Sequence, residues 1–299
     1  MIIVRLRGGL GNQLFQYAAA YSLAVHKSVE LKSDLYTYTK HPYRKYELNN
    51  FNVRLPEATR EEVHRFTGSN PIARYLNKKN NYFNCPAVFA QPHYHFYDDF
   101  FSLPVPLYLS GYWQSEKYFT NVAGSIRKAF TPARPLDSRN ASLASEMKSC
   151  DSVAVHIRRT DYTGTHKGLS FFQPMGLDYY QRAFDAVSQK IDSPRYFIFS
   201  DDIAWARQQL NHLKDTTFID HNRGGDSYKD LLLMSACRNQ IIANSTFSWW
   251  AAWLNDFADK TVIAPQTWFH NNYVTRREPV YACRFYNTRD LIPATWTRL

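Results

Sequence analysis

The sequence predicts an α/β protein built on parallel sheets with helical connections. In the second half of the chain, five short apolar segments alternate with segments of helical length and amphipathic pattern. The amino-terminal end has the same order of strand, loop, helix and strand. Because such alternation joins parallel strands through right-handed crossovers, it indicates parallel sheets. A length of 299 residues, 44% of them hydrophobic, allows two domains with substantial cores.

The first half of the chain is the less regular one. Its middle, residues 36–106, is rich in Tyr, Phe, Asn, Pro and His and has no clean hydrophobic period. On either side of that stretch the pattern can be followed. The elements predicted there are a strand over 2–6, a loop over 7–13, a helix over 14–26, a strand over 28–31, a strand over 107–112 and a helix over 118–130.

The second half begins after a segment with two prolines, residues 131–140, which predicts a linker. We therefore expect one domain over 1–135 and another over 136–299. The strands predicted in the second domain are 153–157, 196–200, 217–220, 240–243 and 261–264. The helices predicted between them are 179–191, 203–213, 228–237 and 249–257.

Charged side chains gather where two of these strands end. His156, Arg158 and Arg159 lie at the end of one strand, and Asp201 and Asp202 directly follow the next. Ligands of open parallel sheets bind at the carboxyl ends of the strands. The two arginines suit a phosphorylated ligand and the acidic pair suits a base. The pattern therefore indicates a nucleotide-sugar site.

A third contribution to this edge comes from residues 240–254, which combine a buried strand, a turn of hydroxyl and amide side chains, and an aromatic helix. This order directs the backbone N–H groups of a helix start at an anion. Ser245, Thr246 and Phe247 occupy that start, and we expect them to cover the phosphate and the nucleoside. The tryptophans of the helix are expected in the core rather than against the ligand: Trp249, Trp250 and Trp253.

The amino-terminal loop contains Gly9-Leu-Gly11-Asn-Gln-Leu14, which has leucine in place of the third glycine of a dinucleotide fingerprint. Glu30 stands near the place of a ribose-binding acid, so a dinucleotide-dependent oxidoreductase or epimerase is an alternative. A backbone that approaches a ligand closely explains the glycines better, with Asn12 offering its amide to that ligand. An ordinary tight turn between strand and helix is the remaining explanation.

Four motifs occur in order along the chain: Gly8-Gly-Leu-Gly-Asn-Gln-Leu-Phe-Gln-Tyr, His156-Ile-Arg-Arg-Thr-Asp-Tyr, Phe199-Ser-Asp-Asp and Asn244-Ser-Thr-Phe-Ser-Trp-Trp-Ala-Ala-Trp-Leu. Together they resemble the α-1,2-fucosyltransferases of glycosyltransferase family 11, particularly the bacterial enzymes. The resemblance covers almost the whole chain. It implies a GT-B fold, with two Rossmann-like domains facing across a cleft. Residues 1–135 would be the acceptor side, and residues 136–299 would bind GDP-fucose.

The activity implied by this resemblance is inverting transfer of L-fucose from GDP-β-L-fucose to the 2-hydroxyl of a terminal galactose. The acceptor would be an oligosaccharide or glycan, such as a bacterial O-antigen unit, and the product an α-1,2 linkage. GDP-fucose is then a co-substrate, and we expect no cofactor and no metal. A glycan-binding module that has lost catalysis is a further alternative, against which the intact Asn12, Arg158 and Asp161 argue.

The resemblance also assigns residues to the donor site. Arg158 would bind the diphosphate, where a bidentate cation stabilises the charge that gathers on the departing GDP. His156 corresponds to a residue that contacts the nucleotide, and a satisfied core histidine is the alternative. Asn12 corresponds to an asparagine that reaches the leaving phosphate from the opposing domain, with Gly11 beside it in the donor-binding loop.

Two acidic roles remain to be assigned. A carboxylate complements the N1–H and N2–H2 edge of guanine, and we favour Asp201 over Asp202 because Asp202 is placed to cap a helix. Inverting transfer needs a group that accepts the proton of the acceptor hydroxyl, and Asp161 is the candidate, followed by His166. Alternatively, Asp161 pairs with Arg159 and holds the loop, or the proton passes late to the leaving diphosphate.

The charge balance bounds the partners. A net charge of +10 and a pI near 9.3 suit an anionic substrate or an acidic membrane surface. The basic residues are dispersed, and we expect no nucleic-acid partner. The amino-terminal apolar run is too short for a signal peptide and no stretch has the length of a membrane span. We expect a cytoplasmic enzyme, with at most a weak peripheral association with the inner membrane.

Metal and disulfide chemistry find little support. His93 and His95 could form a metal pair, but an acceptor-binding or surface role is favoured because no cysteine lies nearby. The acidic pairs lack the D-x-D spacing of a metal-diphosphate motif. The four cysteines are far apart and are expected as reduced thiols: Cys85, Cys150, Cys237 and Cys283.

Overall fold

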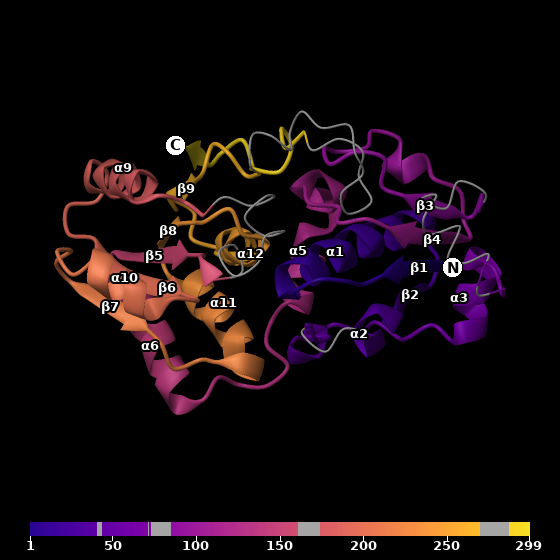
Figure 1. Cartoon of the computed structure of the whole chain (residues 1–299), viewed down its shortest axis with the longest axis horizontal. Coiled ribbons are helices and arrows are strands. Elements are labelled where there is room, and N and C mark those ends of the chain that lie inside the picture. The colour runs from indigo at the N-terminus through magenta and orange to yellow at the C-terminus, as the bar shows by residue number, and fades with distance from the viewer. Residues whose placement is uncertain (41–43, 71, 73–84, 161–173, 270–286) are drawn as a thin grey trace. The chain divides into compact units, whose positions relative to one another are not determined.

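The computed structural model describes residues 1–40, 44–70, 72, 85–160, 174–269 and 287–299 (Figure 1). The chain forms two compact units, and it passes from the first to the second between Ala133 and Arg134. Residues 287–293 belong to the first unit and residues 294–299 to the second. The sequence-based division into 1–135 and 136–299 did not include this return of the chain to the first unit.

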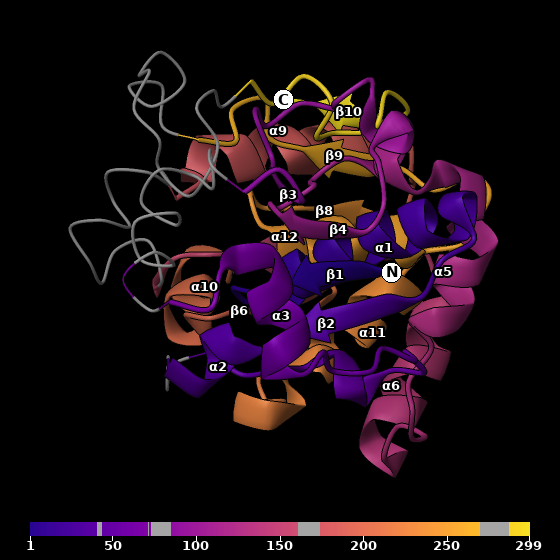
Figure 2. The same ribbon diagram turned by 90° about the vertical axis from the view of Figure 1, so that its right-hand side faces the viewer.

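The first unit is built on a four-stranded parallel sheet in the order β2-β1-β4-β3 (Figure 2). Its buried residues Ile3 and Tyr108 share a core cluster with Phe66, which places α3 on that face of the sheet. The strands are β1 (Ile2–Arg5), β2 (Leu31–Asp34), β3 (Val88–Ala90) and β4 (Leu107–Ser110). The helices are α1 (Leu10–Lys27), α2 (Tyr36–Lys40), α3 (Arg60–Thr67) and α5 (Ala123–Ala129).

Three predictions for the first unit were wrong in their bounds. Helix α1 begins at Leu10, so Gly11, Asn12 and Gln13 lie in its first turn rather than in the predicted loop. Strand β2 begins at Leu31 because Ser28, in the left-handed region with φ 53°, ends α1 where the strand was expected. The helix predicted over 118–130 starts as two 3₁₀ turns, and only α5 is α-helical. Helix α3 and strand β3 had no clear period to predict them.

The second unit is built on a six-stranded parallel sheet in the order β10-β9-β8-β5-β6-β7 (Figure 1, with β10 labelled in Figure 2). The five predicted strands and four predicted helices are all present. The strands are β5 (Ser152–Ile157), β6 (Arg195–Ser200), β7 (Thr216–Ile219), β8 (Asn239–Ile241), β9 (Val262–Ala264) and β10 (Thr297–Arg298). The helices are α6 (Ser138–Ser149), α9 (Leu177–Ser188), α10 (Ile203–Gln209), α11 (Ser227–Ala236) and α12 (Thr246–Leu254).

Helix α6 occupies the end of the predicted linker and the residues after it. Its start is fixed by Asp137, whose carboxylate accepts a hydrogen bond from the backbone N–H of Asn140 at 3.0 Å. An aspartate before a helix is a strong cap, but the prolines upstream obscured it. Helix α12 begins at Thr246, three residues before the predicted start, with Ser245 as its cap. The predicted burial of its tryptophans is confirmed, since Trp249 and Trp250 are fully buried and Trp253 nearly so.

The strand order fixes where a ligand can bind in each unit. In the second unit the chain runs outward from β5 through β6 to β7 and then returns to β8 on the other side of β5. The connections after β5 and β8 therefore leave in opposite directions, which opens a crevice at their carboxyl ends. In the first unit β1 and β4 are the two central strands: the chain runs outward from β1 to β2 and later enters from the edge strand β3 to β4.

No helix among the residues described is long and apolar enough to cross a membrane. Three cysteines lie in the described part of the chain as free thiols, and Cys283 lies outside it.

Candidate functional site

The loop after β5 is fixed by a single carboxylate at the end of the neighbouring strand. Asp201 accepts hydrogen bonds from the backbone N–H of Arg159 at 2.8 Å and from the backbone N–H and hydroxyl of Thr160 at 3.1 and 2.7 Å. Its Oδ2 also lies 3.3 Å from the Nε of Arg158. The sequence predicted Asp201 as the acceptor for guanine, and the structure shows this carboxylate organising the arginine loop. The guanine role stays a prediction.

Arg158 lies at the carboxyl end of a strand, as predicted, and this end is at the switch point of the second sheet. It follows β5 directly, and β5 is the strand beside which the chain order reverses. Its side chain is 24% exposed, so the guanidinium is held near the surface against Asp201 rather than in the core. A guanidinium held in this way at the carboxyl end of a parallel strand is suited to bidentate hydrogen bonding with a phosphate group.

Arg159 has a different environment from its neighbour. Its guanidinium carbon lies 3.8 Å from the ring centre of Trp205, and its Nε lies 3.6 Å from the carboxylate of Asp202. Asp202 also accepts a hydrogen bond from the backbone N–H of Trp205 at 3.2 Å and so caps α10, one of the two roles considered for it. Its role in donor binding stays a prediction. The predicted partner of Arg159, Asp161, lies outside the described residues, as does His166.

His156 is buried on the sheet face opposite α9 and α10. Val155 and Ile157, on either side of it, belong to the core cluster that includes those helices, while the His156 ring lies 5.8 Å from the ring of Phe247 on α12. Burial, reinforced by the charge of Arg158, lowers the pKa of His156 to about 3. The imidazole is therefore neutral at physiological pH. Its Nδ1 is buried and has no hydrogen-bond partner among the residues described.

The start of α12 completes this edge of the second unit. Ser245 follows β8 closely, is nearly buried, and its hydroxyl accepts a hydrogen bond from the backbone N–H of Phe247 at 3.4 Å. Thr246 and Phe247 are partly exposed. The structure thus brings Arg158, His156 and the α12 start to the two strands that flank the switch point, as the sequence predicted.

The equivalent edge of the first unit is formed by the glycine-rich motif. Gly8 has φ +82°, a conformation that L side chains rarely adopt, which explains why a glycine stands there. The buried Gln13 donates to the carbonyl of Gly8 at 3.2 Å, and Tyr38 donates to the same carbonyl at 3.1 Å. Gly11 is buried in the first turn of α1 and Asn12 is partly exposed beside it. The motif is thus held in shape by its own glutamine.

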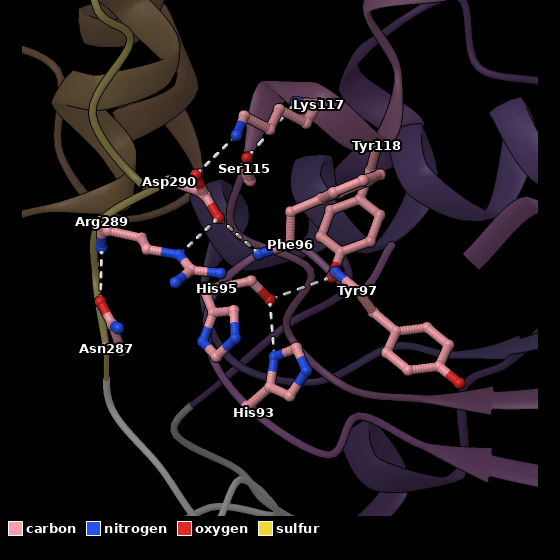
Figure 3. Close-up of polar contacts among 10 residues, drawn as sticks. All are labelled: His93, His95, Phe96, Tyr97, Ser115, Lys117, Tyr118, Asn287, Arg289 and Asp290. Carbon is pink, nitrogen blue, oxygen red and sulfur yellow. Dashed lines mark hydrogen bonds and ion pairs between the residues drawn. The ribbon is translucent and has the colours of Figure 1, made fainter. Parts of the chain in front are cut away.

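Residues 93–97 of the first unit meet the returning chain end in Figure 3. Asp290, with a side chain only 10% exposed, accepts from the backbone N–H of Phe96 at 3.0 Å and from the Lys117 ammonium at 2.7 Å. The rings of His93 and His95 stack 3.6 Å apart, and His93 Nδ1 donates to the carbonyl of His95 at 3.1 Å. No group of three or more metal-binding side chains occurs among the residues described.

Sequence reasoning missed three polar residues that are buried or partly buried. Gln91 and Gln114 lie within or next to the irregular first half, where no period marks them as buried, yet both are almost fully inaccessible. In the second unit, Asp230 on α11 accepts a hydrogen bond from Asn222 at 2.8 Å, and burial raises its pKa to about 7. A lone acid in a predicted helix is expected to face solvent, so the partly buried position of Asp230 could not be predicted.

Comparisons with known proteins identify a family for this chain. The model of glycosyl transferase family 11 matches residues 77–286 of the chain. An alpha-1,2-colitosyltransferase of Escherichia coli is 33% identical over 308 residues, which cover 100% of this chain and 99% of that protein. The O-antigen biosynthesis glycosyltransferase WbnK of Escherichia coli is 29% identical, with 89% of this chain and 94% of that protein covered.

Solved structures share the fold at low sequence identity. The fucosyltransferase NodZ from Bradyrhizobium superposes with a TM-score of 0.52 at 16% identity, covering 84% of this chain and 91% of that one. POFUT1 in complex with GDP-fucose gives a TM-score of 0.50 at 14% identity, covering 87% and 96%. Both support the predicted GT-B fold class. The protein belongs to glycosyltransferase family 11 and is a glycosyltransferase. The oxidoreductase alternative is thereby discarded.

Proposed function

We propose that this glycosyltransferase transfers L-fucose from GDP-β-L-fucose to the 2-hydroxyl of a terminal galactose, forming an α-1,2 linkage with inversion at the fucose anomeric carbon. The observation that carries the proposal is the arginine loop after β5, which Asp201 fixes at the switch point of the second sheet. A nucleotide diphosphate is the ligand that this arrangement of guanidinium, helix start and crevice suits.

Arg158 has the central role in this proposal. Breaking the bond between the sugar and GDP leaves negative charge on the diphosphate, and a guanidinium held at that place lowers the barrier. The Nε contact with Asp201 sets the direction of the guanidinium plane before the ligand arrives. The backbone N–H groups at the start of α12 add fixed partial positive charge. We therefore propose transfer without a metal ion.

His156 acts as a neutral partner for the nucleotide. With a pKa of about 3, the imidazole neither titrates near neutral pH nor adds to the positive charge beside Arg158. Its buried Nδ1, which has no partner among the described residues, can exchange a hydrogen bond with a bound nucleotide. This favours the ligand role over the alternative of a satisfied core histidine.

Asp161 is proposed as the base that accepts the proton of the acceptor hydroxyl. It directly follows Thr160 in the sequence, whose backbone N–H and hydroxyl donate hydrogen bonds to Asp201. Asp161→Asn should leave GDP affinity nearly unchanged while transfer falls roughly 10²-fold or more. Normal turnover in a folded Asp161→Asn protein would remove Asp161 from the mechanism.

A second donor is supported by one observation. The 33% identity with an alpha-1,2-colitosyltransferase extends over the whole of both chains. A colitosyl group is a fucosyl group without its 3-hydroxyl, so the same diphosphate site would serve either donor. The relative WbnK, named for O-antigen biosynthesis, favours an O-antigen unit as acceptor. The net charge of +10 would allow weak association with an anionic membrane surface.

The test is a transfer assay with purified protein treated exhaustively with EDTA. GDP-fucose and GDP-colitose are each paired with a panel of galactosides, and the linkage of the product is determined. We expect α-1,2 fucosylation of galactose that survives chelation. Transfer from GDP-colitose alone would select the second donor. Loss of activity on chelation, restored by Mg²⁺ or Mn²⁺, would overturn the metal-independent mechanism. Glycan binding without any turnover would support a module that has lost catalysis.

A further inference from the structure

The segment after β4 in the first unit has an unusual backbone. Trp113, three residues beyond the end of β4, has φ 56°, a left-handed conformation that is an outlier for a bulky side chain. Its indole is fully buried against Phe100 and Tyr118, at ring distances of 5.3 and 5.5 Å. Strain of this kind persists only where packing holds it, and it is common at functional sites. The left-handed backbone at Trp113 sets the direction of the next residue, Gln114.

Gln114 links two other residues through opposite ends of one carboxamide. Its side chain is buried, with 4% exposure. The hydroxyl of Tyr94, also buried, donates to Gln114 Oε1, and Gln114 Nε2 donates to Asn12 Oδ1 at 2.7 Å. The three side chains thus form one directed series of hydrogen bonds, Tyr94 to Gln114 to Asn12. The amide oxygens of Gln114 and Asn12 each accept a hydrogen bond in this series. Each amide can therefore make further contacts as a donor through its N–H groups.

The amide nitrogen of Asn12 is the free end of this series. No described residue accepts a hydrogen bond from Asn12 Nδ2, whereas its Oδ1 is occupied by Gln114. A β-carbon at Gly8 would lie 2.6 Å from Asn12 Nδ2, so the glycine leaves the space in which that nitrogen sits. A donor held in one direction without a partner suits an anionic oxygen, which accepts without reorganisation of the protein.

We propose that Gln114 is a positioning residue that holds the Asn12 carboxamide with its N–H groups directed at the diphosphate of the donor. The inference rests on the proposed function, since it takes the ligand to be a nucleotide diphosphate. Gln114 itself does not touch the ligand. If the Asn12 amide were turned over, its carbonyl oxygen would face the phosphate and repel it. Gln114 excludes that orientation by donating to Asn12 Oδ1.

Gln114→Glu is the informative substitution because it keeps the shape and removes the donor. A carboxylate at this position can only accept, so Asn12 would have to turn its N–H groups toward residue 114 and its oxygen toward the ligand. We expect the dissociation constant of GDP to rise and kcat to fall, together by roughly 10²-fold in kcat/KM for the donor. Gln114→Met, which imposes no orientation, should lower kcat/KM by only about 10-fold.

The control is Gln91→Glu, a change of the same kind in a side chain that follows β3 and contacts the loop after β4. Gln91 Oε1 accepts from the backbone N–H groups of Tyr112 and Trp113 at 2.8 and 3.1 Å, and a glutamate keeps that acceptor. Neither contact involves Asn12. Gln91→Glu should therefore retain near wild-type kinetics, with any loss confined to the melting temperature, which is measured for every variant. Kinetic losses in Gln91→Glu as large as those in Gln114→Glu would overturn the proposal.

A double-mutant cycle separates positioning through Asn12 from a purely structural role. Asn12→Ala removes the group that Gln114 orients, so adding Gln114→Glu to Asn12→Ala should change GDP affinity and kcat by less than about 2-fold. If Gln114→Glu instead costs the same factor with and without Asn12, the inference fails while the proposed function stands. If the wild-type protein binds no GDP and transfers no sugar, the proposed function fails and the inference fails with it.

Discussion

The two units present chemically different edges at equivalent places in their sheets. At the switch point of the second unit, the polar side chains are charged: Arg158 and Arg159 are held by Asp201 and Asp202. After the central strands β1 and β4 of the first unit, the corresponding groups are amides and glycines, with Gln114 donating to Asn12 beside Gly8. One fold class therefore supplies both a charged edge and a neutral edge.

This difference has a consequence for the chemistry. A charged edge stabilises charge strongly but must itself be neutralised while no ligand is bound, and here the aspartates do so. A neutral edge needs no counter-charge, but its value depends entirely on direction, because an amide turned over presents the wrong atom. We therefore expect the charged edge to be sensitive to loss of charge and the neutral edge to be sensitive to loss of orientation.

The largest effect is expected for Arg158→Lys. Lysine keeps the charge but loses the planar fork, so kcat should fall roughly 10²–10³-fold, with a smaller loss of donor affinity. The matched control is Arg159→Lys, whose side chain packs on Trp205 and should affect stability more than turnover. Steady-state kinetics on both variants check this. Equal losses at the two positions would show that the edge acts only through its net charge.

The same contrast explains how far the sequence could predict the structure. In the second unit, each predicted strand overlaps the observed one because strands such as β5 are buried on both faces and flanked by long amphipathic helices. Arg158 could be placed because it follows β5 directly, and Ser245 because it comes shortly after β8. In the first unit, Gln114 depends on a left-handed Trp113 and on partners 20 and 102 residues away. Contacts of that range leave no local pattern.

The next effect concerns Asp201. If this carboxylate braces the arginine loop, Asp201→Asn should weaken binding of GDP and inosine diphosphate by the same factor, about 10-fold, because it disturbs charge-assisted hydrogen bonds to Arg159 and Thr160. If Asp201 instead accepts hydrogen bonds from guanine, as the sequence predicted, Asp201→Asn should reduce the preference for GDP over inosine diphosphate. The reason is that inosine lacks the 2-amino group that the carboxylate would bind. Calorimetric titration of both nucleotides distinguishes these outcomes.

A third effect is the pH dependence of stability from His156. Its pKa falls from 6.5 to about 3 on folding, so between these values the unfolded chain binds a proton that the folded chain does not. Stability from this group is complete above pH 6.5 and is lost as the pH falls towards 3. At pH 5 this effect should lower the free energy of unfolding by about 2 kcal/mol.

Denaturant unfolding of wild type and His156→Gln at pH 7 and pH 5 measures this effect. We expect wild type to lose about 2 kcal/mol more than the variant between the two values. Asp230, whose raised pKa acts in the opposite direction, is present in both proteins and cancels in the difference. Identical pH dependence in the two proteins would mean that His156 is not buried in the folded state.

The smallest effect is expected for Asp202, which caps α10 and contacts Arg159 at the outer part of the charged edge. Asp202→Ala removes the acceptor for the backbone N–H of Trp205 and should lower the free energy of unfolding by about 1 kcal/mol, with kcat nearly unchanged. Asp202→Asn keeps a capping oxygen but removes the charge, and it should restore most of the stability because a partly exposed ion pair contributes little. If Asp202→Asn is as unstable as Asp202→Ala, the ion pair with Arg159 matters more than the cap. If either variant lowers kcat as much as Arg158→Lys, the division between a binding arginine and a packing arginine is wrong.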